Sequence, residues 1–260
     1  MIRPEQIRGF FPPSLREEPA FQKYMLKEYI QLLILDYLSN TEYVKSLVLI
    51  GGTNLRLIGG IDRFSEDLDF DCKNFSQKDF TMMTDELLVF LKRFGFDAVI
   101  RDKQEPKLTA FRRNYYFPGY LLHVGLSAFR DERFLIKVEC QDQLIDYTSD
   151  FTMIKGCGFF FPFKSPPLPV LCAMKLSALF SRQKGRDFYD AMFLMPQHLP
   201  DFSFLKARIG IGNLNELKSS VSELLTRIDL SQKAKDFEHL LFNKQNSKRI
   251  LAFGEFVDGL

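Results

Sequence analysis

The spacing of apolar residues divides the chain into a first part of mixed character and a second part that is helical. In the first part, short apolar runs with the two-residue period of strands alternate with longer runs of helical period. Ser76 and Asp79 have the spacing of a helix N-terminal cap, and Gly95 suits the end of that helix. The expected strands are 46–50, 68–72, 98–101, 120–128 and 134–141, the expected helices are 20–38, 53–58 and 76–94, and 107–117 is a strand or a loop.

Proline and glycine mark both ends of this first part. Residues 1–19 are rich in proline and charge and are expected to be irregular, while the Pro and Gly residues of 156–169 predict a domain boundary near Pro166. Beyond it, helices are expected at 170–182 and 187–195, with two or three more between 202 and 260. We therefore expect an α/β (α+β) fold, in which 1–165 form an α/β domain and 166–260 form a helical domain.

The composition narrows the class of protein. Apolar residues make up 46% and charged residues 26% of the chain, which is typical of a globular protein with a buried core. The net charge of +2 indicates no overall attraction to nucleic acid, although a local basic patch stays possible. The 4 cysteines form no Cys-x-x-Cys, which argues against a zinc site or a disulfide framework. No early apolar run is long enough for a signal peptide or a membrane span, so we expect a cytoplasmic protein.

The strongest local signal is the acidic run that extends from Asp67 to Asp71. On a strand its three aspartates share one face, while Leu68 and Phe70 point into the core. Carboxylates so close together repel one another, and a divalent cation such as Mg²⁺, which prefers oxygen ligands, removes that repulsion. The run therefore predicts a metal site at Asp67 and Asp69, with Asp71 a weaker candidate. A solvated acidic edge strand is the alternative interpretation.

Two other segments strengthen the prediction of a metal site. The first expected strand ends in Gly51-Gly52-Thr53, where backbone N–H groups and the threonine hydroxyl can bind a phosphate, although most such turns are only turns. On the last expected strand of this part, Glu139 is an acid flanked by core-facing residues. Its alternative interpretation is a half-exposed acid beside Lys137.

These features, in this order, resemble the signature of the polymerase-β-like nucleotidyltransferases. That signature is a Gly-Gly-Thr/Ser turn, an acid-apolar-acid strand and a later acid between apolar residues. The stretch 54–66 separates Thr53 from Asp67, which suits the pattern. The runs Ile50-Gly-Gly-Thr-Asn-Leu-Arg-Leu and Arg63-Phe-Ser-Glu-Asp-Leu-Asp-Phe resemble one branch more closely, the AbiEii/AbiGii toxin-like nucleotidyltransferases.

The second part of the chain resembles the same branch. Lys175-Leu-Ser-Ala and the run from Arg182 to Asp190 look like its Lys-x-x-Ala and Arg-x-Lys-x-Arg-Asp-x-Tyr-Asp motifs. The resemblance covers roughly residues 45–195, and no motif is evident in the segment that follows. One small departure from the family pattern is that the third acid is Glu139, at a position where Asp is also common. A glutamate at this position still allows metal binding.

The resemblance implies a fold, a reaction and its ligands. The fold has a mixed sheet in the N-terminal half, and the enzyme uses Mg²⁺ or Mn²⁺ to move a nucleotide group from a nucleoside triphosphate (NTP) to an acceptor. The implied acceptor is RNA, at the acceptor end of tRNA, and the implied role is the toxin of a toxin–antitoxin or phage-defence pair with a cognate antitoxin. The implied catalytic residues are Asp67, Asp69, Glu139, Lys175 and Asp187; the nucleotide-binding residues are Gly51, Gly52, Thr53, Ser65, Lys175 and Arg186; the metal ligands are Asp67, Asp69 and Glu139.

Other interpretations of these residues stay open. Arg182, Arg186 and Asp190, spaced four apart, can be no more than surface ion pairs of a helix. The acceptor can be a protein side chain or a small molecule instead of RNA. The chain can also be a nucleotide-binding or partner-binding module without catalysis, but such a module is expected to lose its metal-binding acids, and here Asp67 and Asp69 are both present.

Overall fold

A five-stranded mixed sheet organises the N-terminal half of the chain. The computed structural model describes residues 3–102 and 109–260, and the strand order is β1-β2-β5-β4-β3. The two central strands, β2 and β5, run parallel, and the other neighbouring pairs are antiparallel. The strands are β1 (Leu47–Ile50), β2 (Asp67–Cys72), β3 (Val99–Ile100), β4 (Phe111–Tyr116) and β5 (Leu135–Gln141). The predicted α/β class with a mixed sheet is confirmed.

The chain divides into two units, each described here by itself. The first, the sheet unit, comprises Met1–Gly60, Phe64–Leu144 and Asp150–Ser165. The second, the helical unit, comprises Ile61–Arg63, Ile145–Ser149 and Pro166–Leu260. The last crossing from one unit to the other lies between Ser165 and Pro166. No helix among the described residues combines the length and the apolar character that crossing a bilayer requires.

The three helices that the periodicity predicted in the sheet unit begin and end close to their expected positions. They are α3 (Gln22–Ser39), α4 (Gly51–Leu57) and α5 (Gln77–Arg93). The Ser76 hydroxyl accepts the backbone N–H of Asp79, and the Asp79 carboxylate accepts the N–H of Ser76, so the predicted cap is a reciprocal capping box. α3 is buried along most of its length, which makes it the central helix of this unit.

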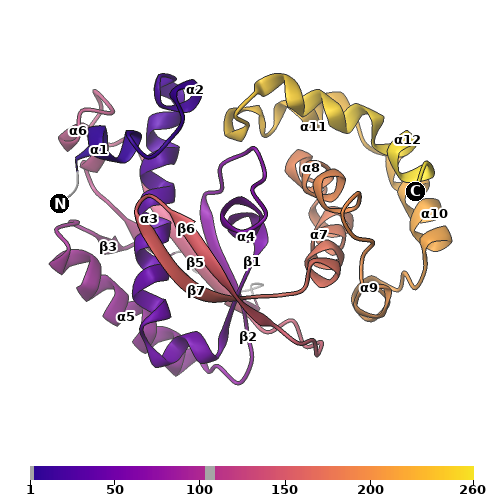
Figure 1. Cartoon of the computed structure of the whole chain (residues 1–260), viewed down its shortest axis with the longest axis horizontal. Helices are drawn as coiled ribbons and strands as arrows, with labels where there is room; N and C mark the ends of the chain where they lie inside the picture. The colour runs from indigo at the N-terminus through magenta and orange to yellow at the C-terminus, as the bar shows by residue number, and fades with distance from the viewer. Residues whose placement is uncertain (1–2, 103–108) are drawn as a thin grey trace. The chain divides into compact units, whose positions relative to one another are not determined.

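A two-stranded hairpin, β6 (Asp150–Gly156) and β7 (Phe159–Ser165), completes the sheet unit. The sequence predicted only a break in pattern over 156–169. The glycines of that stretch form the hairpin turn, with φ of +85° at Gly158, and they connect two strands of the sheet unit. Phe159 packs on Tyr29 of α3 with ring centroids 5.5 Å apart, and the hairpin and α3 are drawn close together in Figure 1.

Two other predictions of local structure are wrong. The expected strand 120–128 begins instead with the short helix α6 (Tyr120–His123), because Gly119 has the left-handed φ of +63° and turns the chain before it. The expected irregular lead-in contains the short helices α1 (Pro4–Arg8) and α2 (Pro13–Arg16) and the 3₁₀ turn η1 (Pro19–Phe21). Each begins at a proline, whose fixed φ suits a first helical position. Of the segment 107–117, residues 107 and 108 lie outside the described residues, and Phe111–Tyr116 is a strand.

The helical unit contains more helices than the periodicity predicted. Its elements are α7 (Leu168–Arg182), α8 (Gly185–Leu194), α9 (Phe202–Ile209), α10 (Leu214–Leu225), α11 (Leu230–Lys235), η3 (Glu238–Leu240), η4 (Lys244–Ala252) and α12 (Phe253–Asp258). The side chains of Asp201, Asn213 and Asp229 accept backbone N–H groups at the starts of α9, α10 and α11. Such caps help to stabilise short helices such as α9 and α11.

Candidate active site

Register between β2 and β5 brings together acids that are far apart in the sequence. Asp69 lies directly opposite Glu139, and Asp67 lies opposite Lys137. The burial of β5 alternates strictly, with Ile136 and Val138 in the core and the residues between them partly exposed. Asp67, Asp69, Lys137 and Glu139 therefore form one partly exposed cluster, called here the carboxylate cluster.

Two basic side chains, Lys137 within the carboxylate cluster and Arg112 beside it, offset part of the negative charge of its three acids. Lys137 Nζ lies 3.2 Å from Asp67 Oδ2 and 3.5 Å from Glu139 Oε2. Arg112, opposite Glu139 on β4, places its Nε 2.8 Å from Glu139 Oε2. Burial lowers the pKa of Lys137, but the charges of Asp67, Asp69 and Glu139 raise it by more, so its pKa is above the ordinary value. Sequence reasoning gave neither base a role, although alternation places Lys137 on the Glu139 face.

Asp71 has a different environment from the other two aspartates of β2. Its side chain is buried, and its Oδ1 accepts the backbone N–H of Gln143 at 3.0 Å. It therefore holds the segment that follows β5.

The glycine turn lies against the carboxylate cluster. Gly51 has φ of +74°, and a Cβ at this position would lie 2.5 Å from Asp69 Oδ2. No other residue type fits here without displacing that carboxylate. The Thr53 hydroxyl, buried, donates to the carbonyl oxygen of Asp67 and lies 3.0 Å from the Ser65 hydroxyl. In this arrangement the two hydroxyls hold the start of β2, and Gly52 is partly exposed beside Gly51.

The donor atoms of the carboxylate cluster suit a hard divalent cation. Carboxylate oxygens are the ligands that Mg²⁺ and Mn²⁺ prefer, and the cluster already attracts the cationic groups of Lys137 and Arg112. Within 3–102 and 109–260, no three Asp, Glu, His or Cys side chains converge on one point as a ligand set. The residue types therefore fit the metal.

A second cluster lies wholly inside the helical unit, around the fully buried Asp190. Arg63 binds it through two hydrogen bonds, from Nε at 2.7 Å and from a terminal nitrogen at 2.8 Å. Lys175 Nζ lies 2.8 Å from Asp190 Oδ2 and is itself buried. Burial raises the pKa of Asp190, but the charges of Arg63 and Lys175 lower it by more, to about 2. At Lys175, burial and the charge of Arg63 lower the pKa by more than the charge of Asp190 raises it, so the pKa of Lys175 lies below its usual range.

The surface ion-pair interpretation of this region is wrong for Asp190, because no part of its side chain is exposed. Arg182 pairs instead with Asp187, at 2.6 Å. Asp187 is also buried and accepts the backbone N–H of Lys184 at 3.1 Å, so it caps α8. Arg186 is partly exposed. Sequence reasoning missed Arg63 and Asp190 as a pair; their only signal was their place inside the matched motifs.

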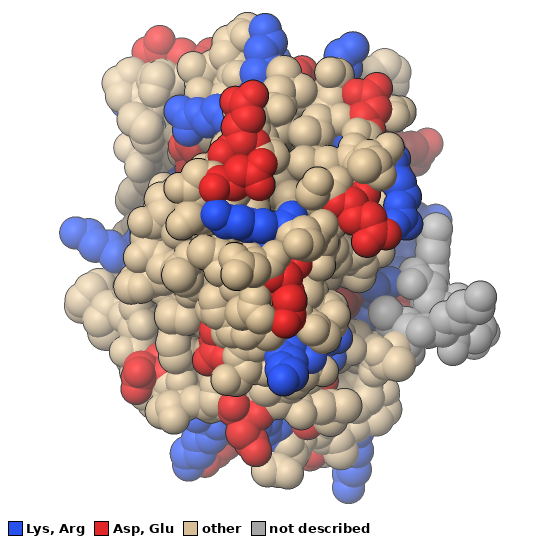
Figure 2. Space-filling model, turned by 90° about the vertical axis from the view of Figure 1, so that its right-hand side faces the viewer, with Lys and Arg blue, Asp and Glu red and all other residues tan. Residues whose placement is uncertain are grey.

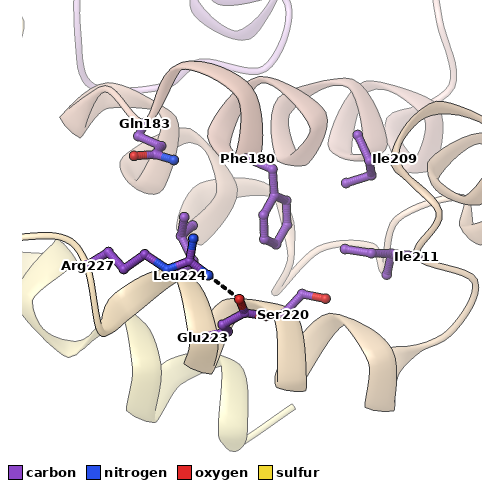
Figure 3. A pocket seen from close by; sticks show the side chains of 8 residues that line it. All are labelled: Phe180, Gln183, Ile209, Ile211, Ser220, Glu223, Leu224 and Arg227. Atoms are coloured by element: carbon purple, nitrogen blue, oxygen red, sulfur yellow. Dashed lines mark hydrogen bonds and ion pairs between the residues drawn. The ribbon is translucent and has the colours of Figure 1, made fainter.

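A shallow cavity of about 320 Å³ also lies in the helical unit (Figure 3). Its lining mixes apolar side chains with polar and charged ones, and these include the ion pair of Glu223 with Arg227. None of the predicted site residues lines it. On the face drawn in Figure 2, acidic and basic side chains are interspersed without a large patch of one sign.

Comparison with known proteins gives the family and the fold. The model of the family described as "Nucleotidyl transferase AbiEii toxin, Type IV TA system" matches residues 33–240. Among solved structures, MenT4, a nucleotidyltransferase toxin from Mycobacterium tuberculosis, is similar over 100% of this chain and 91% of its own, with 16% identity and a TM-score of 0.61. JHP933 from Helicobacter pylori is similar over 90% of both chains, with 21% identity and a TM-score of 0.53.

A putative nucleotidyltransferase from H. pylori is similar over 88% of this chain and 92% of its own, with 21% identity and a TM-score of 0.53. These likenesses show the fold. A search of curated protein sequences found no match. The family model spans most of the chain and includes the carboxylate cluster, Lys175 and Asp187. The chain therefore belongs to the AbiEii family of nucleotidyl transferase toxins of type IV toxin–antitoxin systems.

Proposed function

We propose that this nucleotidyltransferase uses Mg²⁺ or Mn²⁺ to transfer a nucleotidyl group from an NTP to an RNA acceptor, at the acceptor end of tRNA. The observation that carries the metal-dependent reaction is the register of Asp69 opposite Glu139 beside the Cβ-free Gly51. It places carboxylates of two neighbouring strands side by side, next to a residue that has no side chain. The RNA acceptor is the acceptor that the family resemblance implies, and type IV membership implies an antitoxin as a partner in the cell.

In this proposal Asp67, Asp69 and Glu139 hold the metal. When bound, the metal neutralises charge on the triphosphate and on the attacking and leaving oxygens. Glu139 takes up the proton of the attacking hydroxyl, and Arg112, 2.8 Å away, orients its carboxylate. A bond forms between the acceptor oxygen and the α-phosphorus, the bond from that phosphorus to the bridging oxygen breaks, and pyrophosphate leaves.

The remaining assignments concern the nucleotide. We assign Gly51, Gly52, Thr53 and Ser65 to nucleotide binding. The hydroxyls of Thr53 and Ser65 act indirectly, by holding β2 in position: the Thr53 hydroxyl donates to the carbonyl oxygen of Asp67, the first residue of that strand. Lys175, Arg186 and Asp187 are assigned to nucleotide binding or catalysis as the family motifs imply. Because the ammonium of Lys175 already pairs with Asp190, we further assign Asp190 and Arg63 as positioning residues for Lys175.

The direct test incubates the protein with each α-³²P-labelled NTP, Mg²⁺ and total bacterial RNA. The variant Asp67→Asn with Asp69→Asn is compared with Asp97→Asn, an exposed acid on a loop. We expect label in RNA of tRNA size with the wild type and the control, and none with the double variant. Label on protein or on a small molecule would overturn the RNA acceptor. Absence of any transfer, with NTP still bound, would favour a binding module.

A further inference from the structure

The outward face of the β6–β7 hairpin exposes aromatic rings. Ile154, Phe161 and Phe163 face the core and are buried, so the alternate positions 151, 153, 155, 160, 162 and 164 face outward. Phe160 is 68% exposed and Phe151 is 58% exposed, in contrast to the buried phenylalanines of the core. Such large exposed apolar side chains gathered on one face indicate a surface that binds something.

Across the two strands, each exposed ring lies opposite a lysine. Phe151 is opposite Lys164, and Lys155 is opposite Phe160, with Met153 and Pro162 between these pairs. Lys164 Nζ lies 5.7 Å from the centroid of the Phe151 ring and donates to the carbonyl oxygen of Lys45 at 2.5 Å. None of the six outward positions holds an acid. The hairpin face, defined by these six positions, therefore combines flat apolar rings with positive charge only.

We propose that the hairpin face is a stacking platform for a single-stranded segment of the RNA acceptor; this inference rests on the proposed function. Bases stack on exposed aromatic rings whatever their sequence, and the lysine opposite each ring binds a phosphate. Phe160 lies four residues along the strand direction from Phe151, a separation of about 13 Å. The rings therefore bind two different bases of an extended strand.

The charge of the hairpin face favours RNA over a protein partner. A protein interface centre is depleted of charge, whereas here Lys155 and Lys164 stand directly opposite the two rings. A polyanion satisfies both features at once. On the face drawn in Figure 2, by contrast, charges of both signs are interspersed.

The test measures the binding of a fluorescein-labelled single-stranded RNA of about 12 nucleotides to the full chain by fluorescence anisotropy, without NTP. The variants are Phe151→Leu with Phe160→Leu, which keeps apolar area and removes the rings, and Lys155→Gln. Phe129→Leu is the matched control, since Phe129 is 74% exposed and lies outside the hairpin. Circular dichroism checks that all variants fold.

The double leucine variant, which loses both rings, is expected to bind at least roughly fivefold more weakly, and Lys155→Gln is expected to reduce the slope of log affinity against log salt by about 0.7. The Phe129→Leu control is expected to bind as the wild type does. Unchanged binding by the double leucine variant would overturn the proposal, even if NTP transfer to RNA were found. Hairpin-dependent binding supports it, even if transfer to RNA were not found. Sedimentation showing a dimer that Phe151→Ser with Phe160→Ser dissociates would also overturn it and assign the face to self-association.

Discussion

The positive charge of Lys137 is expected to affect how tightly the carboxylate cluster binds a metal cation. Its ammonium lies between Asp67 and Glu139, where a metal ligand set would close. A divalent cation that approaches these carboxylates is repelled by this ammonium at short range, where partial burial weakens the screening by water. Lys137 therefore keeps the acids together in the free protein, and in the proposed site it would compete with the metal.

Lys137→Met is expected to bind Mn²⁺ roughly tenfold more tightly than the wild type, because it removes one like charge a few ångströms from the ion. Electron paramagnetic resonance of free Mn²⁺ measures this affinity without any turnover. Lys92→Met, an exposed lysine of α5, is the control and is expected to leave the affinity unchanged. Weaker binding by Lys137→Met would mean that the lysine organises the site without competing for it.

Gly51 and Gly60 offer a matched pair of substitutions. Both have φ near +75°, but a Cβ at Gly51 meets Asp69 Oδ2 at 2.5 Å, whereas one at Gly60 meets nothing within 4 Å. Each alanine variant is expected to lose about 1–2 kcal/mol of stability through left-handed strain. Only Gly51→Ala is expected to lose Mn²⁺ affinity and transfer rate, by about tenfold or more. Equal rates for the two variants would show that the close approach to Asp69 is unimportant.

At the scale of elements, the structure confirms those predictions that depend on residues close together in the sequence. The capping box of Ser76 and Asp79 and the alternation of β5 depend on neighbouring residues, so they could be predicted. The parallel pairing of β2 with β5, which places Asp69 opposite Glu139, depends on contacts distant in sequence and could not. The β6–β7 hairpin was missed because its Gly158 turn and its Pro162, on an outward position, resemble loop residues.

The buried cluster of the helical unit shows the same limit. Lys175 and Asp187 were predicted as site residues from motifs, but their partners were not. Arg63 and Asp190 are separated by 127 positions, so only the tertiary fold reveals that they form one ion-paired group. This group ties the segment Ile61–Arg63 to α8 within the helical unit.

Asp190→Asn is expected to destabilise the protein at pH 7 by about 3–5 kcal/mol, since it leaves two buried cations without their counter-charge. The pKa of Asp190 is about 2 in the folded protein against an ordinary 3.8. Its contribution is therefore present above about pH 4 and is lost as the pH falls towards 2. Urea unfolding of the wild type and of Asp190→Asn across this pH range is expected to show that the difference between their free energies of unfolding shrinks as the pH falls. A constant difference, or one no larger than that of the exposed Glu223→Gln control, would contradict this account.

Gly185→Ala tests the packing of α8. A Cβ at Gly185 would lie 1.9 Å from the carbonyl oxygen of Lys233 in α11, so backbone must move. We expect a loss of about 1–3 kcal/mol in urea unfolding. The control Gly259→Ala, with its nearest neighbour at 3.4 Å, is expected to change little. Equal effects of the two variants would mean that α8 and α11 are not tightly packed.

At the scale of the whole molecule, function is local and not a consequence of overall charge. A net charge of +2 gives no field that draws in RNA, so binding of an acceptor requires a specific surface such as the hairpin face. The family and the fold place the chain among nucleotidyl transferases, and we propose the carboxylate cluster as the source of the oxygen donors for the reaction.

The most direct test of this account is the Mg²⁺-dependent rate of nucleotidyl transfer by Asp69→Asn, measured at saturating labelled NTP beside the wild type and Asp97→Asn. Asparagine keeps the shape of the side chain beside Gly51 and removes its charge. The account predicts a rate reduced by roughly a hundredfold or more, with unfolding and NTP binding close to those of the wild type. A folded Asp69→Asn protein that transfers at the wild-type rate would contradict the assignment of the carboxylate cluster as the catalytic site.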